Sequence, residues 1–278
     1  MKESIFNVIE QKILTTENGE IVYWVNDCNN SKETLIFLHG LTADHTLFEK
    51  QISYYYKSFK LICWDAPAHG KSRPYINFSY SNSAEHLKCI LDEEKIKEAI
   101  FMGQSMGGYI IQTFYKKYSK MVKGFIGIDT SPFGLKYYSK LDVWWLKQIE
   151  WMSMCFPYNF LIKSIAKSCS YTKEGRQNMI NILMQYSKKE LCKLMGTGYL
   201  EFLKENCNID IKCPVLIIVG EYDKTGKVKK YCKDWSKNNS FPLKIIPKAA
   251  HNSNFDNSET VNREIDLFIN NLIEKSYI

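Results

Sequence analysis

Gly103-Gln104-Ser105-Met106-Gly107-Gly108 is the most informative segment of this 278-residue chain. An apolar run at 99–102 precedes it, and a helix-like segment at 109–115 follows it. A Gly-x-Ser-x-Gly motif between a strand and a helix predicts a tight turn that projects the serine hydroxyl into a cleft. Glycine stands on both sides of the serine because the turn leaves no space for side chains there. We therefore expect Ser105 to be a nucleophile held in strained backbone.

Short apolar runs on both sides of this motif predict strands that alternate with helices. Two N-terminal strands, 5–13 and 21–25, are predicted around a turn at 17–20. Continuous apolar runs are typical of parallel strands that helices cover on both faces. Such runs lie at 35–38, 61–64, 99–102, 125–128, 214–220 and 243–246. The chain is therefore expected to adopt an α/β fold with a mostly parallel sheet flanked by helices.

Two helices outside the central motif are also indicated. Asn82-Ser83-Ala84-Glu85 predicts a helix start, because Glu85 stands three residues after a capping residue. The chain closes with an amphipathic helix, in which apolar residues recur at steps of three and four. These residues are Val261, Ile265, Phe268, Ile269, Leu272 and Ile273.

Residues 131–212 interrupt the strand pattern. The segment contains no convincing buried strand and reads as amphipathic helices, with breaks near Pro157, Gly175 and 196–198. We expect a helical cap, or lid, inserted at 131–212 into a core formed by 1–130 and 213–278. Three of the six tryptophans lie in it, and they are interpreted either as helical core or as an apolar wall that binds substrate near the serine. They are Trp144, Trp145 and Trp151.

Four features of the chain together resemble a known family. Two are His39-Gly40-Leu41 and the Gly-x-Ser-x-Gly segment, and a third is the late pair Asp223 and His251. The fourth, Asp65-Ala66-Pro67-Ala68-His69-Gly70-Lys71-Ser72, matches an Asp-x-Pro-Gly-x-Gly-x-Ser loop except that Ala68 replaces a glycine. The chain resembles the α/β-hydrolase fold family, in its capped, serine esterase-like branch. The resemblance covers nearly all of the chain outside the insertion, and it implies a hydrolase that needs no cofactor.

A serine nucleophile needs a base, and the base needs an orienting acid. In this family the order along the chain is serine, acid, histidine. Of the five histidines only His251 follows Ser105, so His251 is the predicted base. Asp223 is the preferred acid, Asp129 is the alternative, and Glu221 is expected to point elsewhere. The four histidines that precede the serine are His39, His45, His69 and His86.

The developing oxyanion requires backbone N–H donors that are already in place. Met106, directly after the nucleophile, supplies one donor. Gly40 allows a sharp turn after the 35–38 strand, so the Leu41 N–H is the predicted second donor. His39 is expected to make a structural hydrogen bond within the same loop.

The distribution of charge indicates which classes of binding partner are expected. The chain carries a net charge of +7. Its one short basic cluster, 227–230, is interpreted as a solvated helix face rather than a nucleic-acid contact. Residues 131–212 hold 12 Lys and Arg against 7 Asp and Glu, a balance of +5. This balance indicates either a solvated helical surface or attraction to an anionic substrate or lipid surface.

The cysteines and the N-terminal sequence indicate the cellular compartment of the protein. Nine cysteines without a Cys-x-x-Cys pair, several of them in apolar runs, indicate reduced thiols rather than disulfides. No cluster has zinc-ligand spacing, so we expect no metal. Residues 1–7 lack a long apolar run, and no stretch reaches the length of a membrane span. We expect a cytoplasmic protein without integral membrane contact, and nothing in the sequence indicates its oligomeric state.

These features predict a serine hydrolase of the carboxylesterase type. The expected substrate is a small or medium carboxylic ester or thioester with an apolar acyl group, cleaved through an acyl-enzyme on Ser105. The first alternative is hydrolysis of a carbon–carbon bond in a diketone-like metabolite by the same triad. Epoxide hydrolysis and dehalogenation fit less well, because those relatives use an aspartate nucleophile, and no acidic pair is marked out to bind the amine of an aminopeptidase substrate. The alternative from another class is a small-ligand-binding protein of this fold.

Overall fold

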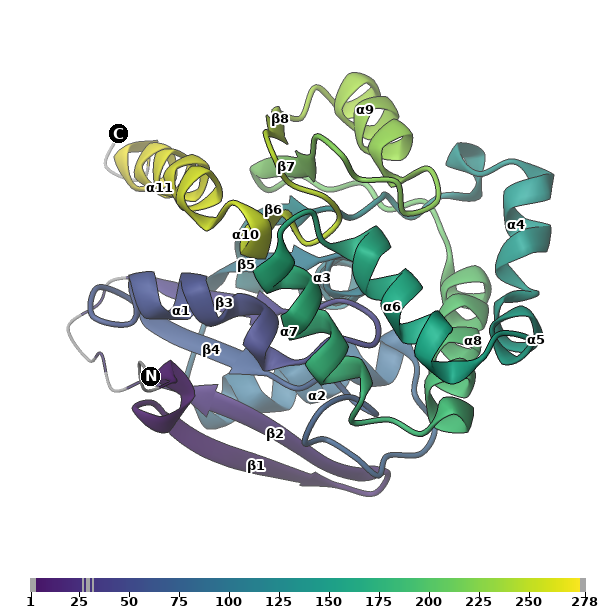
Figure 1. The fold of residues 1–278 in the computed structure, drawn as a ribbon. Helices are drawn as coiled ribbons and strands as arrows, with labels where there is room; N and C mark the ends of the chain where they lie inside the picture. The colour runs from purple at the N-terminus through teal and green to yellow at the C-terminus, as the bar shows by residue number, and fades with distance from the viewer. Residues whose placement is uncertain (1–3, 27, 29–30, 32, 276–278) are drawn as a thin grey trace.

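The computed structural model describes residues 4–26, 28, 31 and 33–275. Its centre is an eight-stranded sheet with the strand order β1-β2-β4-β3-β5-β6-β7-β8 (Figure 1). The pairs β1–β2 and β2–β4 are antiparallel, and all the others are parallel. The expectation of a mostly parallel α/β sheet is therefore confirmed. The strands are β1 (Glu10–Thr16), β2 (Gly19–Val25), β3 (Thr34–Leu38), β4 (Lys60–Trp64), β5 (Ala99–Gln104), β6 (Val122–Ile128), β7 (Val215–Gly220) and β8 (Leu243–Ile246).

Helices cover both faces of this sheet. Residues of β3 alternate between the faces, because successive side chains of a strand point to opposite sides. Ile36 and Leu38 join the core formed with α2, α3 and α9, and Leu35 and Phe37 join the core formed with α1 and α11. The helices outside the insertion are α1 (Glu49–Tyr55), α2 (Tyr80–Glu93), α3 (Met106–Tyr118), α9 (Val228–Asn239), α10 (Ser253–Asp256) and α11 (Ser258–Lys275).

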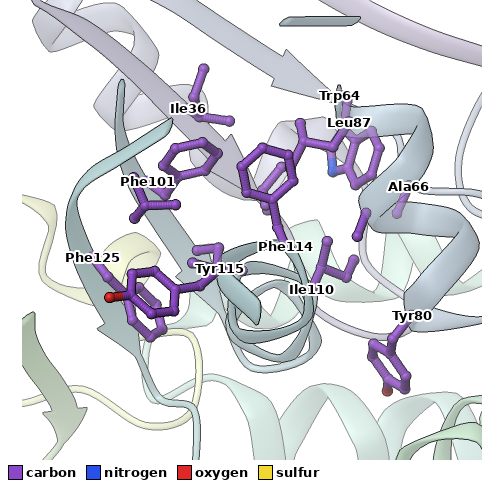
Figure 2. Packing of buried hydrophobic residues seen from close by; sticks show 14 of the residues in the cluster. Ile36, Trp64, Ala66, Tyr80, Leu87, Phe101, Ile110, Phe114, Tyr115 and Phe125 are labelled. Atoms are coloured by element: carbon purple, nitrogen blue, oxygen red, sulfur yellow. The ribbon is translucent and has the colours of Figure 1, made fainter. Parts of the chain in front are cut away.

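Figure 2 shows the first of these two cores at the sheet surface. Phe101 of β5 and Phe114 of α3 are both fully buried, and their ring centroids lie 5.2 Å apart. Burial of each such side chain contributes about 1.5–3 kcal/mol to the free energy of folding. This packing fixes α3 against β5, and the turn between these two elements carries Ser105.

Two of the predicted element boundaries are wrong. The N-terminal strand begins at Glu10, because Ile5–Asn7 form a short 3-10 helix, η1, whose Ile5 packs into the core. Helix α2 begins before the predicted capping pattern. Its N-cap is Ser79, whose side chain accepts a hydrogen bond from the Asn82 N–H. At the first boundary the core contact of Ile5 outweighs the local strand signal, and at the second an earlier capping serine sets the start.

The helical insertion between β6 and β7 contains five α-helices. The predicted break at Pro157 is confirmed, since this residue is the N-cap of α6. A break does occur near Gly175, between α6 and α7 at residues 170–172, although Gly175 itself lies in the first turn of α7. The predicted break at 196–198 is wrong, because both glycines lie inside α8. A side chain on Gly196 would collide with Glu150 of α5, so glycine here allows close helix packing rather than a break. The helices are α4 (Lys140–Leu146), α5 (Ile149–Met154), α6 (Tyr158–Cys169), α7 (Lys173–Leu183) and α8 (Lys188–Glu205).

The structure also bears on the predictions about disulfides, membrane-spanning helices and metal sites. All nine cysteines are free thiols. Within residues 4–26, 28, 31 and 33–275, no helix is both long and apolar enough to cross a membrane. Over the same residues, no group of three or more His, Cys, Asp or Glu is arranged to hold a metal ion. Residues 1–3, on which part of the N-terminal prediction depends, lie outside the described chain.

Candidate active site

Ser105 occupies the turn between β5 and α3, and its backbone is strained. Its φ is 48° and its ψ is −112°, a conformation that non-glycine residues rarely adopt. The turn is held by two hydrogen bonds, from the Ser105 N–H to Ile128 O (2.9 Å) and from Thr130 Oγ1 to Ser105 O (2.7 Å). The neighbouring glycines leave space for the crossing backbone. A side chain on Gly107 would collide with Leu38 O.

The structure brings together the three residues that the sequence predicts as nucleophile, base and acid. His251 Nε2 lies 3.0 Å from Ser105 Oγ, and His251 Nδ1 lies 2.9 Å from Asp223 Oδ2. Asp223 follows β7, and its second carboxylate oxygen accepts a hydrogen bond from the Thr225 N–H at 2.8 Å. Asp223 and His251 are 7% and 5% exposed, so solvent screens their interaction little.

Charge and burial act on His251 in opposite directions. Burial lowers the pKa of His251, but the charge of Asp223 and the hydrogen bond to it outweigh this effect and raise the pKa above 6.5. Because Asp223 accepts the Nδ1 proton, Nε2 of the neutral imidazole is left as an acceptor that faces the serine hydroxyl. This arrangement is suited to removing a proton from Ser105.

Asp129, the alternative acid, is placed elsewhere. It follows β6 and is fully buried, where it accepts hydrogen bonds from the Gly220 N–H (2.7 Å) and the Ser253 N–H (2.9 Å). Burial and the nearby charge of Asp223 raise the pKa of Asp129 to about 8. Asp129 therefore joins the end of β7 to the segment that follows His251, without a hydrogen bond to the imidazole. Glu221 accepts a hydrogen bond from the Lys248 N–H, away from the base as expected.

The loop after β3 passes close to the serine turn. Leu41 and Met106 both line the cavity at Ser105. Met106 is the first residue of α3, and its N–H therefore has no acceptor within the helix. A side chain on Gly40 would collide with the Gln104 side chain, so the loop passes close to the turn only because Gly40 lacks one.

His39 holds this loop in place, as expected. The Ala66 N–H donates to His39 Nε2 (2.9 Å), so the ring proton lies on Nδ1 and is donated to Gly40 O (2.8 Å). Burial lowers the pKa of His39, which keeps the ring neutral. The 65–72 loop is also structural, since Asp65 accepts hydrogen bonds from His45 and from the Lys71 N–H.

Ala68 departs from the family pattern, and its backbone shows why glycine is usual there. Its φ is 66°, in the left-handed region that a side chain disfavours. The loop keeps this conformation although Ala68 carries a methyl group. The methyl group of Ala68 therefore makes this backbone conformation energetically less favourable than glycine would.

A cavity of about 410 Å³ opens on Ser105 and His251. Its walls come from both the core and the insertion, and they include seven aromatic residues as well as the ion pair of Asp142 and Lys227. The hydroxyl groups in the wall are largely engaged elsewhere: Tyr80 donates to Gly198 O (3.1 Å), and Tyr109 and Tyr138 share hydrogen bonds with Ser131. The ring faces are thus left as an apolar surface. The aromatic residues of the wall are Tyr80, Tyr109, Tyr138, Trp145, Tyr199, Phe202 and Tyr231.

The three predicted tryptophan contacts are placed differently from one another. Trp145 lines the cavity and is 46% exposed, whereas Trp144 and Trp151 are 50% and 56% exposed and are not among the residues that line it. The interpretation of the three as helical core is wrong, because about half of each side chain is exposed. The side chains of α4 and α5 that line the cavity beside Trp145 are Leu146 and Ile149.

Sequence reasoning missed two polar residues of the site. Gln104 Nε2 donates to the His251 carbonyl oxygen at 2.7 Å and so fixes the backbone of the base. Its position beside the serine was the signal available in the sequence. Thr225 lines the cavity, and its Oγ1 is buried without a hydrogen-bond partner among the described residues. No pattern in the sequence distinguishes Thr225 from other loop threonines.

The sequence of this chain is similar to those of known proteins. The sequence model of the α/β hydrolase fold matches residues 33–258. The hydrolase YugF of Bacillus subtilis, itself uncharacterized, is 34% identical over 98 residues, which are 34% of this chain and 36% of that protein. The pimeloyl-[acyl-carrier protein] methyl ester esterase of Wigglesworthia glossinidia brevipalpis is 27% identical over 237 residues, or 78% of this chain and 86% of that protein.

Solved structures with the same fold are more distant in sequence. MenH from S. aureus superposes with a TM-score of 0.74 at 21% identity, over 92% of this chain and 99% of that one. The esterase EaEST from Exiguobacterium antarcticum superposes with a TM-score of 0.77 at 15% identity, over 93% and 98% of the two chains. At these identities the likeness concerns the fold alone.

Proposed function

Because this chain belongs to the α/β hydrolase fold family, we propose that it is a serine hydrolase that cleaves carboxylic esters or thioesters through an acyl-enzyme on Ser105. The observation that carries the proposal is the continuous hydrogen-bonded series from Asp223 through His251 to Ser105, with distances of 2.9 and 3.0 Å. Ester hydrolysis is also the activity for which the methyl ester esterase that aligns with 78% of the chain is named.

The proposed reaction begins when His251 Nε2 takes the proton of Ser105 Oγ as the oxygen attacks the ester carbonyl carbon. Asp223 stabilises the imidazolium that forms. The protonated His251 then gives its proton to the leaving alcohol or thiol as the tetrahedral intermediate collapses to the acyl-enzyme. In the second half, His251 removes a proton from water as the water oxygen attacks the acyl carbon. The tetrahedral intermediate that forms collapses when the protonated His251 gives this proton to Ser105 Oγ, which releases the acid and restores the free serine.

The Leu41 and Met106 N–H groups are the proposed donors to the oxyanion. Both residues line the cavity at the serine, and neither N–H is needed for an intrahelical bond. Met106 also begins α3, and the positive end of that helix dipole favours negative charge at this point.

The lining of the cavity is suited to binding an apolar acyl group of the substrate. Seven aromatic residues line the cavity, and the hydroxyls of Tyr80 and Tyr109 are hydrogen-bonded to protein atoms. We propose that residues 131–212 act as a cap, with Trp145 at the cavity mouth contacting the acyl chain. Each buried CH₂ would contribute about 0.8 kcal/mol to binding, which favours small and medium chains over acetate.

A fluorophosphonate probe tests the chemistry directly. The probe should label the wild-type protein on Ser105 and leave the Ser105→Ala variant unlabelled, whereas an inert ligand-binding protein of this fold would stay unlabelled in both forms. A panel of p-nitrophenyl esters from acetate to decanoate, run beside diketone substrates, then separates ester hydrolysis from carbon–carbon bond cleavage. Turnover of diketones alone would contradict the proposal.

A further inference from the structure

The outer side of the insertion carries a group of large apolar side chains that we call the aromatic face. Its residues come from α4, α5, the α5–α6 connection and the start of α6, and Figure 1 shows α4 and α5 at the rim of the fold. Each of these side chains is between 44% and 61% exposed. They are Leu141, Trp144, Trp145, Trp151, Phe156 and Phe160.

Four of the rings of the aromatic face form two packed pairs. The centroids of Trp144 and Trp145 lie 4.8 Å apart, edge to face, and Phe156 and Phe160 stack at 5.7 Å. Single exposed apolar residues are ordinary on a protein surface, but six within twenty residues are not. A grouping of this kind is typical of a surface that meets an apolar partner.

Cationic side chains accompany these rings. Lys140, Trp144 and Lys147 are spaced at four and three residues and therefore share one side of the α4 segment. Lys163 follows Phe160 by three residues on α6. The three lysines are exposed, and none makes an ion pair with the described residues. Of the nearby carboxylates, Asp142 is already paired with Lys227 at 2.6 Å.

We propose that the aromatic face docks on the surface of a membrane that contains anionic lipids. Tryptophan and phenylalanine rings bind at the boundary between headgroups and acyl chains, because this boundary accepts an apolar ring and a polar edge together. The lysines would then lie at the level of the lipid phosphates, with their aliphatic stems along the same apolar boundary. This is peripheral binding and requires no membrane-crossing segment.

Charge and shape favour a lipid surface over other occupants. A second copy docked through the same face would add its own three lysines to an interface that already holds Lys140, Lys147 and Lys163, and this excess of like charge opposes association. An acidic protein would satisfy the lysines, but it would also need a matching recess for each projecting ring. A fluid lipid layer takes up projecting rings without preformed recesses.

The aromatic face is continuous with the cavity at Ser105. Trp145 belongs to both, and Leu146 and Ile149 of the same helices line the cavity. Docking would therefore place the cavity mouth at the lipid surface, where an ester with an apolar acyl chain partitions. The binding itself does not depend on the proposed hydrolysis, so vesicle binding and esterase activity can fail separately.

Sedimentation with vesicles tests the apolar part of the proposal. We expect the wild-type protein to bind vesicles of equimolar phosphatidylglycerol and phosphatidylcholine. The triple variant Trp144→Ala, Trp151→Ala, Phe160→Ala should bind them at least about tenfold more weakly. The matched control is Val8→Ala, Ile13→Ala, Leu267→Ala, which removes three exposed apolar side chains elsewhere and should bind like the wild type.

A second set of variants tests the charges. Lys140→Gln, Lys147→Gln, Lys163→Gln should weaken binding to the anionic vesicles by about fivefold per lysine removed. The control Lys97→Gln, Lys120→Gln, Lys233→Gln has the same net charge and should bind like the wild type, because these lysines lie outside the insertion. Thermal melting and turnover of a water-soluble ester verify that every variant is folded.

Several outcomes would overturn the proposal. One is a wild-type protein that binds neither vesicle type, or that binds pure phosphatidylcholine as tightly as the anionic mixture. Another is a set of control variants that lose as much binding as the test variants. A dimer that the Trp144, Trp151 and Phe160 variant abolishes would assign the face to a second copy. Binding of purified acyl carrier protein, lost in both test variants while vesicles are not bound, would assign it to an acidic protein.

Discussion

His251 Nε2 lies 3.0 Å from Ser105 Oγ, although 146 residues separate the two positions in the chain. The helical insertion accounts for much of this separation, and the parallel sheet brings the two together. Ser105 follows β5, Asp223 follows β7, and His251 follows β8. Because parallel strands end at the same edge of a sheet, their following loops meet there.

Replacing Ser105 by alanine is expected to abolish turnover and leave the fold intact. The substitution removes only the hydroxyl group and should lower kcat by about 10³–10⁶-fold. Steady-state kinetics with a p-nitrophenyl ester measure the effect, and the melting temperature of the variant should stay near that of the wild type. A folded variant with wild-type rates would contradict the proposed nucleophile.

The two buried aspartates are expected to respond differently to the same change. Asp223→Asn should lower kcat by about 10⁴-fold, because the imidazole loses control of its tautomer. Asp129→Asn replaces an acceptor of two backbone N–H groups by an amide that satisfies one of them, and should cost about 1–3 kcal/mol of stability. Kinetics and urea unfolding of both variants decide the assignment. A crippled Asp129→Asn enzyme beside an active Asp223→Asn enzyme would reverse it.

The pH dependence of kcat/KM should report the base. His251 must be neutral to accept the serine proton, so kcat/KM should rise with pH through the pKa of His251. Asp223 raises this pKa, and the acid limb should therefore have its midpoint above 6.5. In Asp223→Asn the residual activity should have a lower midpoint, because the stabilising charge is gone. A midpoint that does not move would assign the limb to another group.

The same shift links His251 to stability. Its pKa is higher in the folded protein than the ordinary value of 6.5, so the protonated imidazole stabilises the fold fully below pH 6.5. That contribution is lost as the pH rises through the folded-state value. The difference in unfolding free energy between wild type and His251→Gln should therefore shrink with rising pH, and urea unfolding at pH 5.5 and pH 9 measures it.

Trp145 and Trp144 offer a matched pair for testing the acyl-chain contact. Trp145→Ala should lower kcat/KM more for an octanoate ester than for acetate, because acetate has almost no apolar contact to lose. Trp144→Ala should leave kcat/KM unchanged for both esters, since Trp144 does not line the cavity. Melting temperatures are recorded beside the rates. An equal loss for both esters in Trp145→Ala would mean that this ring supports the cap rather than the substrate.

Gly107 should tolerate no side chain. A methyl group there would collide with Leu38 O, which belongs to the neighbouring strand and has little freedom to move. Gly107→Ala should lower the free energy of unfolding by about 3 kcal/mol and disturb the serine turn. The control is Gly226→Ala, where the space is open and only a φ of +52° opposes the change, at a cost of about 1–2 kcal/mol. Equal destabilisation of the two variants would contradict the steric explanation.

Local pattern was sufficient to predict the sheet and the serine turn. Glycine spacing around Ser105 and the apolar runs of β3 to β7 are properties of neighbouring residues, and such properties are visible in a sequence. The order of Ser105, Asp223 and His251 also follows from the chain once the family resemblance is recognised. The cytoplasmic location, the absence of a cofactor and the oligomeric state are not decided by these features, and the first two stay predictions.

Other features depend on contacts between distant segments, and only the tertiary structure decided them. Asp223 and Asp129 both follow strands at the same sheet edge, and their hydrogen-bond partners alone distinguish them. Gly196 reads as a helix break, yet it lies inside α8, because the approach of Glu150 requires a residue without a side chain. The exposure of Trp144 depends likewise on which side of α4 meets α8, since helical periodicity defines a face but not the partner that covers it.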